Sequence, residues 1–369
     1  MSLPDKFHGA LIGGAIGDAL GVPTEKRYPI EIKERYGEVR DFVAPWHTNG
    51  DNPRHRGDGN VTDDTLMTVM ICRVYLAKRG HIDAHDAAIH LVPLLLAPTT
   101  FVPEYGREMP LIERLFYAEK YLYHRLALAN CDPREGGQGN MVNCGAAMCA
   151  TPVGLMNAAD PAAAYREAID FFAAHQWSYG REAAGVMAAC VAAACAPNVC
   201  IADVCAAALS VAKDGTARAI AAALHAVEGM TNWRCAINPL QQVLLHYMPG
   251  GWTTERRPSG QPSRDGSIEE QPAALALLQE NQGAFTESVI AATNYGHDSD
   301  SIAIMAGSIA GALCGAKALP ESWKATIVQR NRIDFASLSA DMVKLFGTVV
   351  QQDYETAIVR RSALNLNSG

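Results

Sequence analysis

Oxygen-bearing side chains gather at residues 298–301, where the chain reads Asp-Ser-Asp-Ser after a Gly-His pair. An apolar run follows, so Asp298 and Asp300 stand at the expected start of a helix, with the Ser301 hydroxyl beside them. Carboxylates near a helix N-terminus are stabilised by capping and by the helix dipole, and one aspartate satisfies that need. Two carboxylates and a hydroxyl in so short a segment equally suit a hard divalent cation, which prefers oxygen ligands. Taken alone, the segment leaves metal binding and capping open.

A second group of the same kind lies at residues 62–64, within the sequence Val-Thr-Asp-Asp-Thr. Asp63 and Asp64 crowd the first turn of another expected helix, and Thr62 stands at its N-cap position. Adjacent like charges repel each other, so a cation between the two clusters is the natural neutraliser. Thr-Asp-Asp is also good N-cap chemistry, which keeps an explanation without metal open. Because two such clusters occur in one chain, metal binding is favoured over capping alone.

Two glycine series share a four-residue period and indicate how the clusters meet. The first series places one glycine per helical turn near the N-terminus, and the second does so after Asp300: Gly9, Gly13, Gly17 and Gly21, then Gly307, Gly311 and Gly315. Such smooth faces allow two helices to approach closely, so we expect these helices to pack together. Asp18 is expected to be a structural hydrogen-bonding residue. Pro23 ends the first helix, which leaves Glu25 in a loop and free to reach a cation.

A glycine-rich loop at residues 135–155 is a further candidate for ligand binding. Gly136, Gly137 and Gly139 expose backbone N–H groups, and a helix is expected to begin near Asn143. Such loops can bind phosphate, but a plain loop–helix junction explains the pattern as well. The pattern is neither a Walker loop nor a dinucleotide-binding fingerprint.

Helical periodicity dominates the rest of the chain. Helices are expected at residues 81–96, 113–130, 161–174 and 268–279, and alternating β-branched runs are few. The aromatic residues of the 113–130 segment are expected in the core. Residues 249–267 form an irregular insertion, interpreted as a solvated loop rather than a flap, and residues 364–369 a frayed tail. The prediction is one compact all-α domain spanning residues 1–369.

Composition and charge exclude several classes of protein. The net charge of −8 argues against a nucleic-acid-binding or anionic membrane surface. No signal peptide is evident at the N-terminus, and residues 183–202 fit a buried core helix better than a membrane span. The ten cysteines form no CxxC pair. They are expected to be small buried residues of a cytoplasmic protein rather than zinc ligands or disulfides.

Four motifs in matching order resemble the ADP-ribosylglycohydrolase family, and the similarity spans most of the chain. They are GALIGGAIGDALGVPTE, VTDDTLM, GGQGNMVNCGAAM and NYGHDSDSIAIMAGSIAGALCG. The resemblance implies an orthogonal all-α bundle with two magnesium or manganese ions at the base of a cleft. It also implies hydrolysis of an N- or O-glycosidic bond in an ADP-ribosyl or related ribosyl compound.

The resemblance assigns a role to individual residues of this chain. Metal ligands would come from both clusters: Thr62, Asp63 and Asp64 on one side, and Asp298, Asp300 and Ser301 on the other. The candidate catalytic residues are Glu25, Asp63 and Asp300, with Glu25 contacting metal, ribose or the attacking water. Substrate contacts would come from the glycine-rich loop and two histidines: Gly137, Gly139, Asn140, Asn143, His175 and His297.

Three positions depart from the family pattern. Ser301 replaces the usual Thr and keeps the hydroxyl, whereas His297 replaces a typical Gly and places an imidazole at the cleft. Cys149 stands where many members have Arg. These three differences argue against ADP-ribosyl-arginine as the substrate. A small free metabolite and a modified protein both remain possible substrates, and a silent ADP-ribose-binding or structural relative is the alternative outside enzymes.

Overall fold

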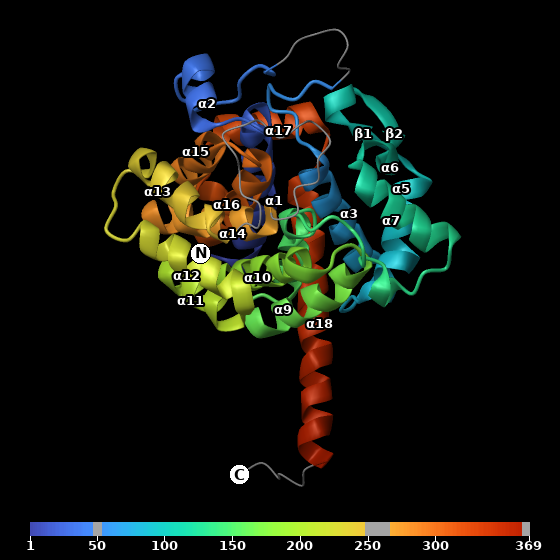
Figure 1. Ribbon diagram of the computed structural model, residues 1–369. Helices are drawn as coiled ribbons and strands as arrows, with labels where there is room; N and C mark the ends of the chain where they lie inside the picture. Colours follow the sequence, from blue (N-terminus) through green and yellow to red (C-terminus); the bar gives the residue numbers. More distant parts are fainter. Residues whose placement is uncertain (47–53, 248–265, 364–369) are drawn as a thin grey trace.

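Helices α1 (Leu3–Gly21) and α16 (Ser299–Cys314) lie side by side at the centre of the fold (Figure 1). The computed structural model describes residues 1–46, 54–247 and 266–363. Nearly every residue of the two helices is buried, including the first glycine series and most of the second. Their contact confirms the packing that the glycine period predicts.

Other helices surround this central pair. The α-helices that follow α1 in the first half of the chain are α2 (Pro29–Tyr36), α3 (Asp63–Lys78), α4 (Ala84–Asp86), α5 (Val92–Leu96), α6 (Leu111–Arg114), α7 (Tyr117–Leu128), α8 (Thr151–Met156) and α9 (Pro161–Phe171). Those of the second half, apart from α16, are α10 (Ser178–Ala194), α11 (Ile201–Val211), α12 (Asp214–Ala226), α13 (Trp233–Leu245), α14 (Gly266–Glu280), α15 (Phe285–Tyr295), α17 (Glu321–Asn331) and α18 (Phe335–Ala363). The predicted all-α class is confirmed.

Short elements join these helices. The single-turn and π-helical pieces are η1 (Val22–Thr24), η2 (Ala87–Leu91), η3 (Pro103–Tyr105), η4 (Pro133–Glu135), η5 (Ala147–Cys149), η6 (Phe172–Ala174) and η7 (Ala316–Ala318). Strands β1 (Thr99–Val102) and β2 (Arg107–Pro110) form an antiparallel hairpin, with Thr99 opposite Pro110. Sequence analysis missed this hairpin because strands of four residues are too short to show an alternating pattern.

The predicted boundaries are correct in some segments and wrong in others. Helix α10 ends before Pro197 and is mostly buried, as expected of a core helix. The helix expected at 113–130 is broken, since Leu115 and Phe116 adopt extended ψ angles of 158° and 146° between α6 and α7. No helix begins at Asn143: its side-chain oxygen accepts a hydrogen bond from the Gly145 N–H at 2.9 Å, which closes a turn instead. Residues 249–265 of the expected insertion and the tail 364–369 lie outside the described residues.

Helix α18 is long and extends away from the body at its C-terminal end (Figure 1). Its first half packs on the core through Phe335, Met342, Leu345 and Val349, whereas residues 350–363 are exposed. Among the described residues, no helix combines the length and the apolar character that crossing a membrane requires.

Backbone atoms of α1 and α16 touch where the glycines lie. A methyl group added at Gly17 would overlap the carbonyl oxygen of Ala303, and one at Gly9 would overlap that of Gly311. We therefore expect Gly17→Ala to force the helices apart and to lower the free energy of unfolding by about 1–3 kcal/mol or more, as overpacking does. Chemical denaturation measures this loss.

Gly347 offers a matched control within α18. It is exposed, and an added methyl group would meet no atom within 4 Å. Because alanine favours helix over glycine, Gly347→Ala is expected to stabilise the protein by about 0.5–1 kcal/mol. Equal stability of the two variants would contradict the close-packed interface.

Candidate active site

A cavity of about 690 Å³ opens where the N-termini of α3 and α16 meet. Its walls include predicted residues from four segments of the chain: Glu25, then Asp63 and Asp64, then Asn143, then Asp298, Asp300 and Ser301. The volume lies within the range of small-molecule sites. The structure therefore brings together the two acidic clusters that the sequence separates.

Asp64 joins the two clusters directly. Its Oδ1 accepts a hydrogen bond from the Thr62 hydroxyl at 3.0 Å, and its Oδ2 accepts one from the Ser301 hydroxyl, also at 3.0 Å. Thr62 is fully buried behind the cavity wall, and its hydroxyl also accepts from the Asp64 N–H at 3.2 Å. Thr62 therefore caps α3 through its hydroxyl, but this capping gives no role to the carboxylates of Asp63 and Asp64.

The capping interpretation does not explain Asp298. This residue occupies the N-cap position of α16, yet its side chain makes no capping hydrogen bond. Its Oδ2 instead accepts a hydrogen bond from the Cys144 thiol, with S and O 3.1 Å apart. Oxygen atoms of Asp298, Asp300 and Glu25 all lie within 4.8 Å of one another, which suits a shared cation.

Arg56 lies against this acidic group and was not predicted from the sequence. Its guanidinium forms ion pairs with Glu25, with Asp300 at 3.1 Å and with Glu104 at 3.1 Å. Lys26 adds a second cation at 2.8 Å from Glu25. Burial opposes ionisation of Glu25, but the positive charges of Arg56 and Lys26 outweigh it and lower the pKa of Glu25. Glu25 is therefore held as a carboxylate.

A second buried arginine supports Asp63. Arg114, at the end of α6, lies 2.9 Å from the Asp63 carboxylate and also pairs with Glu104, whose side chain is fully buried. Glu104 thus orients both Arg56 and Arg114 towards the acidic clusters. No periodic pattern in the sequence marks these three residues, because they come from loops and a single-turn helix.

Asp18 has the structural role that the sequence predicts. Its Oδ2 accepts hydrogen bonds from the backbone N–H of Thr62 at 2.9 Å and from the Thr65 hydroxyl at 2.5 Å. Burial raises the pKa of Asp18 to about 6, against the opposing effect of these hydrogen bonds. Asp18 therefore fixes the start of α3, and with it the positions of Asp63 and Asp64.

The carboxylates facing the cavity carry more negative charge than the nearby side chains neutralise. Burial, followed by the charges of Asp18 and Asp63, raises the pKa of Asp64 well above its usual range. Burial, followed by Glu25 and Asp64, does the same to Asp300. Neither Asp64 nor Asp298 forms an ion pair within the described part of the chain. A donor set of carboxylates and hydroxyls with uncompensated charge fits hard divalent cations.

The glycine-rich loop contributes only part of its predicted residues to the cavity. Asn143 lines it, and its side-chain oxygen accepts a hydrogen bond from Gln176 at 2.7 Å. Asn140 instead donates to the His175 carbonyl at 2.8 Å, and Gly137 packs against the Gln176 backbone. Gly139 is exposed with a φ of 80°. Gly137, Gly139 and Asn140 are not among the cavity-lining residues, and their contact with substrate stays a prediction.

The two predicted histidines are not among the residues that line this cavity. His175 is buried, and its Nε2 lies 3.2 Å from Glu119, which does line the cavity. The Nδ1 atom of His297 lies 2.5 Å from the buried Glu269, and contact of either histidine with substrate stays a prediction. The backbone of His297 pairs with Lys26 and Arg27, which ties the Glu25 loop to Asp298. Cys149 is also buried away from the cavity, with its thiol near the Gly145 carbonyl.

Aromatic residues expected in the core form part of the cavity rim. Tyr123 is buried as expected, but Phe116 and Tyr117 are 39% and 54% exposed. Both line the cavity, and their ring centroids lie 4.5 Å apart. The break between α6 and α7 causes the difference, because it turns these rings out of the core.

Together these features define an all-α protein with an acidic cleft between two helix N-termini that carries candidate metal ligands. The family model for ADP-ribosylglycohydrolase matches residues 1–352. The chain belongs to the ADP-ribosylglycohydrolase family.

One curated relative and one solved structure match along most of the chain, and a second relative matches a short part of it. The uncharacterized protein YegU of Escherichia coli (strain K12) is 24% identical over 353 residues, covering 92% of this chain and 97% of YegU. An uncharacterized protein of Archaeoglobus fulgidus is 38% identical over 77 residues, which cover 20% of this chain and 22% of that protein. A solved structure described as an ADP-ribosylglycohydrolase-related protein complex has a TM-score of 0.56 at 20% identity. It covers 93% of this chain and 99% of its own, which supports the fold.

Proposed function

We propose that this protein is a di-metal hydrolase that cleaves the N- or O-glycosidic bond of an ADP-ribosyl or related ribosyl compound. The observation that carries the proposal is the convergence of Glu25, Asp64, Asp298 and Asp300 at one cavity. Magnesium or manganese is favoured because the donors of the two clusters are hard oxygen atoms. Family membership supports a glycosidic hydrolase.

The walls of the cavity suit a nucleoside diphosphate sugar. Cationic side chains line it together with the acidic residues: Lys26, Arg54, Arg56, Arg114 and Lys120. They would attract the diphosphate, and the exposed rings of Phe116 and Tyr117 offer a surface on which a base would stack, worth about 1–3 kcal/mol. The cavity therefore combines acidic groups, which suit a ligand's hydroxyls through bound cations, with basic groups, which suit its phosphates.

The acidic residues suit a reaction at the ribose. Two bound cations, held by Thr62, Asp63 and Asp64 and by Asp298, Asp300 and Ser301, would neutralise charge as the bond at the anomeric carbon breaks. Glu25 would orient the attacking water and accept its proton. The water oxygen bonds to the anomeric carbon, and the electron pair of the broken bond leaves with the nitrogen or oxygen of the leaving group.

A substrate screen tests the proposal. ADP-ribosyl-arginine, ADP-ribosyl-serine, O-acetyl-ADP-ribose and simple nucleosides would each be incubated with Mg²⁺, with Mn²⁺ or with excess chelator. We expect release of free ribose or ADP-ribose from at least one compound, and no release with chelator. Full activity in excess chelator would contradict the proposed metal dependence. If no compound is cleaved but ADP-ribose binds, the silent binding protein is the correct interpretation.

The same screen makes a prediction about the leaving group. Once two divalent cations neutralise the carboxylates, the guanidinium of an arginine-linked substrate would meet a cavity lined by Lys26, Arg56 and Arg114, and like charges repel. Turnover of ADP-ribosyl-arginine is therefore expected to be at least about tenfold slower than that of an O-linked compound, since about 1.4 kcal/mol of repulsion has that effect. Comparable kcat/KM values for the two substrates would refute this. A comparison of a free metabolite with a modified protein as substrate requires separate assays.

A further inference from the structure

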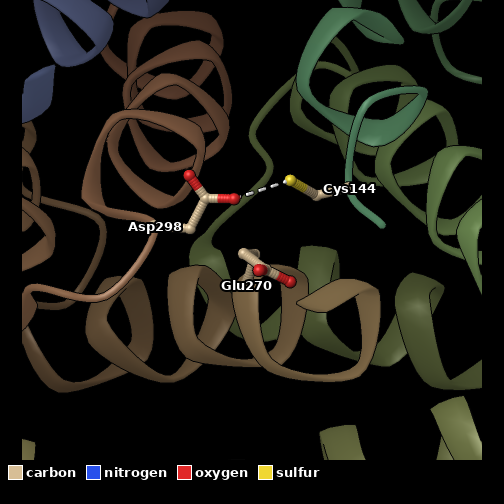
Figure 2. A group of neighbouring side chains, drawn as sticks. All are labelled: Cys144, Glu270 and Asp298. Atoms are coloured by element: carbon tan, nitrogen blue, oxygen red, sulfur yellow. Dashed lines mark hydrogen bonds between the residues drawn. The ribbon is translucent and has the colours of Figure 1, made fainter. Parts of the chain in front are cut away.

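Two potential metal ligands outside the predicted set, Cys144 and Glu270, meet the predicted ligand Asp298 at the acidic cavity. Cys144 comes from the loop before η5, Glu270 from the first turns of α14, and Asp298 from the N-cap of α16 (Figure 2). One donor atom from each lies within 4.8 Å of the other two. Cys144 and Glu270 are 4% and 2% exposed and Asp298 is half-buried, so the group is assembled largely inside the protein from three segments.

The contacts of Cys144 differ from those of an ordinary core cysteine. Its thiol points at Asp298 and donates a hydrogen bond to Oδ2 over 3.1 Å, while the Glu270 carboxylate lies beside the pair (Figure 2). Cys149, by contrast, is buried with its thiol near two backbone carbonyls, those of Gly145 and Ala146. The thiol proton of Cys144 therefore lies between a sulfur and a carboxylate oxygen, where a cation would replace it.

The donor types select a cation unlike magnesium. One sulfur and two carboxylate oxygens suit borderline metals such as Zn²⁺ and Co²⁺, because thiolate is a poor ligand for hard cations. Bond lengths of about 2.3 Å to sulfur and 2.0–2.2 Å to oxygen require donor separations near 3.5 Å in a tetrahedron. Separations within 4.8 Å reach that value by small side-chain rotations.

We propose that Cys144, Glu270 and Asp298 form a mixed sulfur–oxygen site for a zinc-type divalent cation, next to the all-oxygen site. Asp298 belongs to both groups, since it also lies with Glu25 and Asp300. Cys144 and Asp298 line the cavity, so a cation held here would be accessible from the ligand space. The site is a specific exception to the expectation that the cysteines of this chain only fill the core.

Cobalt binding tests the proposal directly. Purified protein without added Mg²⁺ would be titrated with Co²⁺ under reducing conditions. Thiolate coordination produces a sulfur-to-cobalt charge-transfer band that oxygen ligands do not give. We expect one equivalent of this band in the native protein and displacement of it by Zn²⁺. Absence of the band overturns the proposal.

Three variants identify the ligands. Cys144→Ser is expected to abolish the band, and Glu270→Gln, which keeps the thiol, to weaken cobalt affinity at least about tenfold. Cys149→Ser is the matched control, because it removes a buried thiol five residues away and should leave the band intact. A band that survives Cys144→Ser, or unchanged affinity in Glu270→Gln, contradicts the assignment. Thermal melting confirms that each variant is folded.

The readout separates this inference from the proposed hydrolysis. The cobalt–sulfur band is measured without substrate, so it tests the mixed site whether or not the protein cleaves a glycosidic bond. Conversely, magnesium-dependent hydrolysis without any cobalt–sulfur band would leave the proposed function in place and remove only the mixed site.

Discussion

Replacing Asp300 with asparagine is expected to abolish manganese binding and hydrolysis together. Asp300 stands in the first turn of α16, and its oxygen lies within 4.8 Å of those of Glu25 and Asp298. An amide is uncharged and a weaker ligand than a carboxylate. Even residues that only support metal ligands cost 10–100-fold in affinity or activity when changed, so we expect a loss of at least about 100-fold here. Calorimetric titration with Mn²⁺ and a turnover assay measure the two effects.

The control for Asp300→Asn is a carboxylate away from the site. Asp341 is exposed on α18, and Asp341→Asn should leave manganese affinity and turnover unchanged. Asp300 also pairs with Arg56, so folding must be checked by thermal melting without added metal. A folded Asp300→Asn variant that binds manganese as tightly as the native protein would contradict the proposed ligand.

The features that sequence analysis predicted correctly are those with a local period. One glycine per turn in two separate helices already implies a close contact, and the overlap of an added methyl group at Gly17 with Ala303 shows that contact. The meeting of Glu25 with Asp300 follows from this contact between the helices. Since Asp300 begins α16 and Glu25 follows α1, packing of the two helices brings these carboxylates together.

The missed features depend on contacts between residues far apart in the chain. Arg56 reaches Asp300 across 244 positions, and nothing near Arg56 in the sequence marks it as part of a site. The partner of His297 was missed for a related reason. The sequence shows an imidazole next to Asp298, but not the buried Glu269 on α14 that lies 2.5 Å from its Nδ1 atom. Charge balance in a buried site is a property of the whole fold, so a local pattern predicts its ligands better than its counter-ions.

Glu25→Gln is expected to lower kcat by about 10²–10⁴-fold while substrate still binds. That range is typical for loss of a general base, and glutamine keeps the size of the side chain but cannot accept a proton. Stability should change little, because Arg56 keeps its ion pairs with Glu104 and Asp300 when Glu25 is neutral. Turnover at saturating substrate and a thermal melt measure the two quantities. Glu34→Gln, on the exposed face of α2, is the control.

The ion pairs of Glu25 provide the competing explanation, and the same assay decides between them. Lys26 and Arg56 lower the pKa of Glu25, which makes it a weaker base than a free carboxylate. If Glu25 serves only to neutralise these cations, Glu25→Gln should turn over nearly as fast as the native protein. If it orients or deprotonates water, the rate falls although the cations remain. A loss confined to KM would assign Glu25 to substrate binding, since an interaction made equally in ground and transition states leaves kcat unchanged.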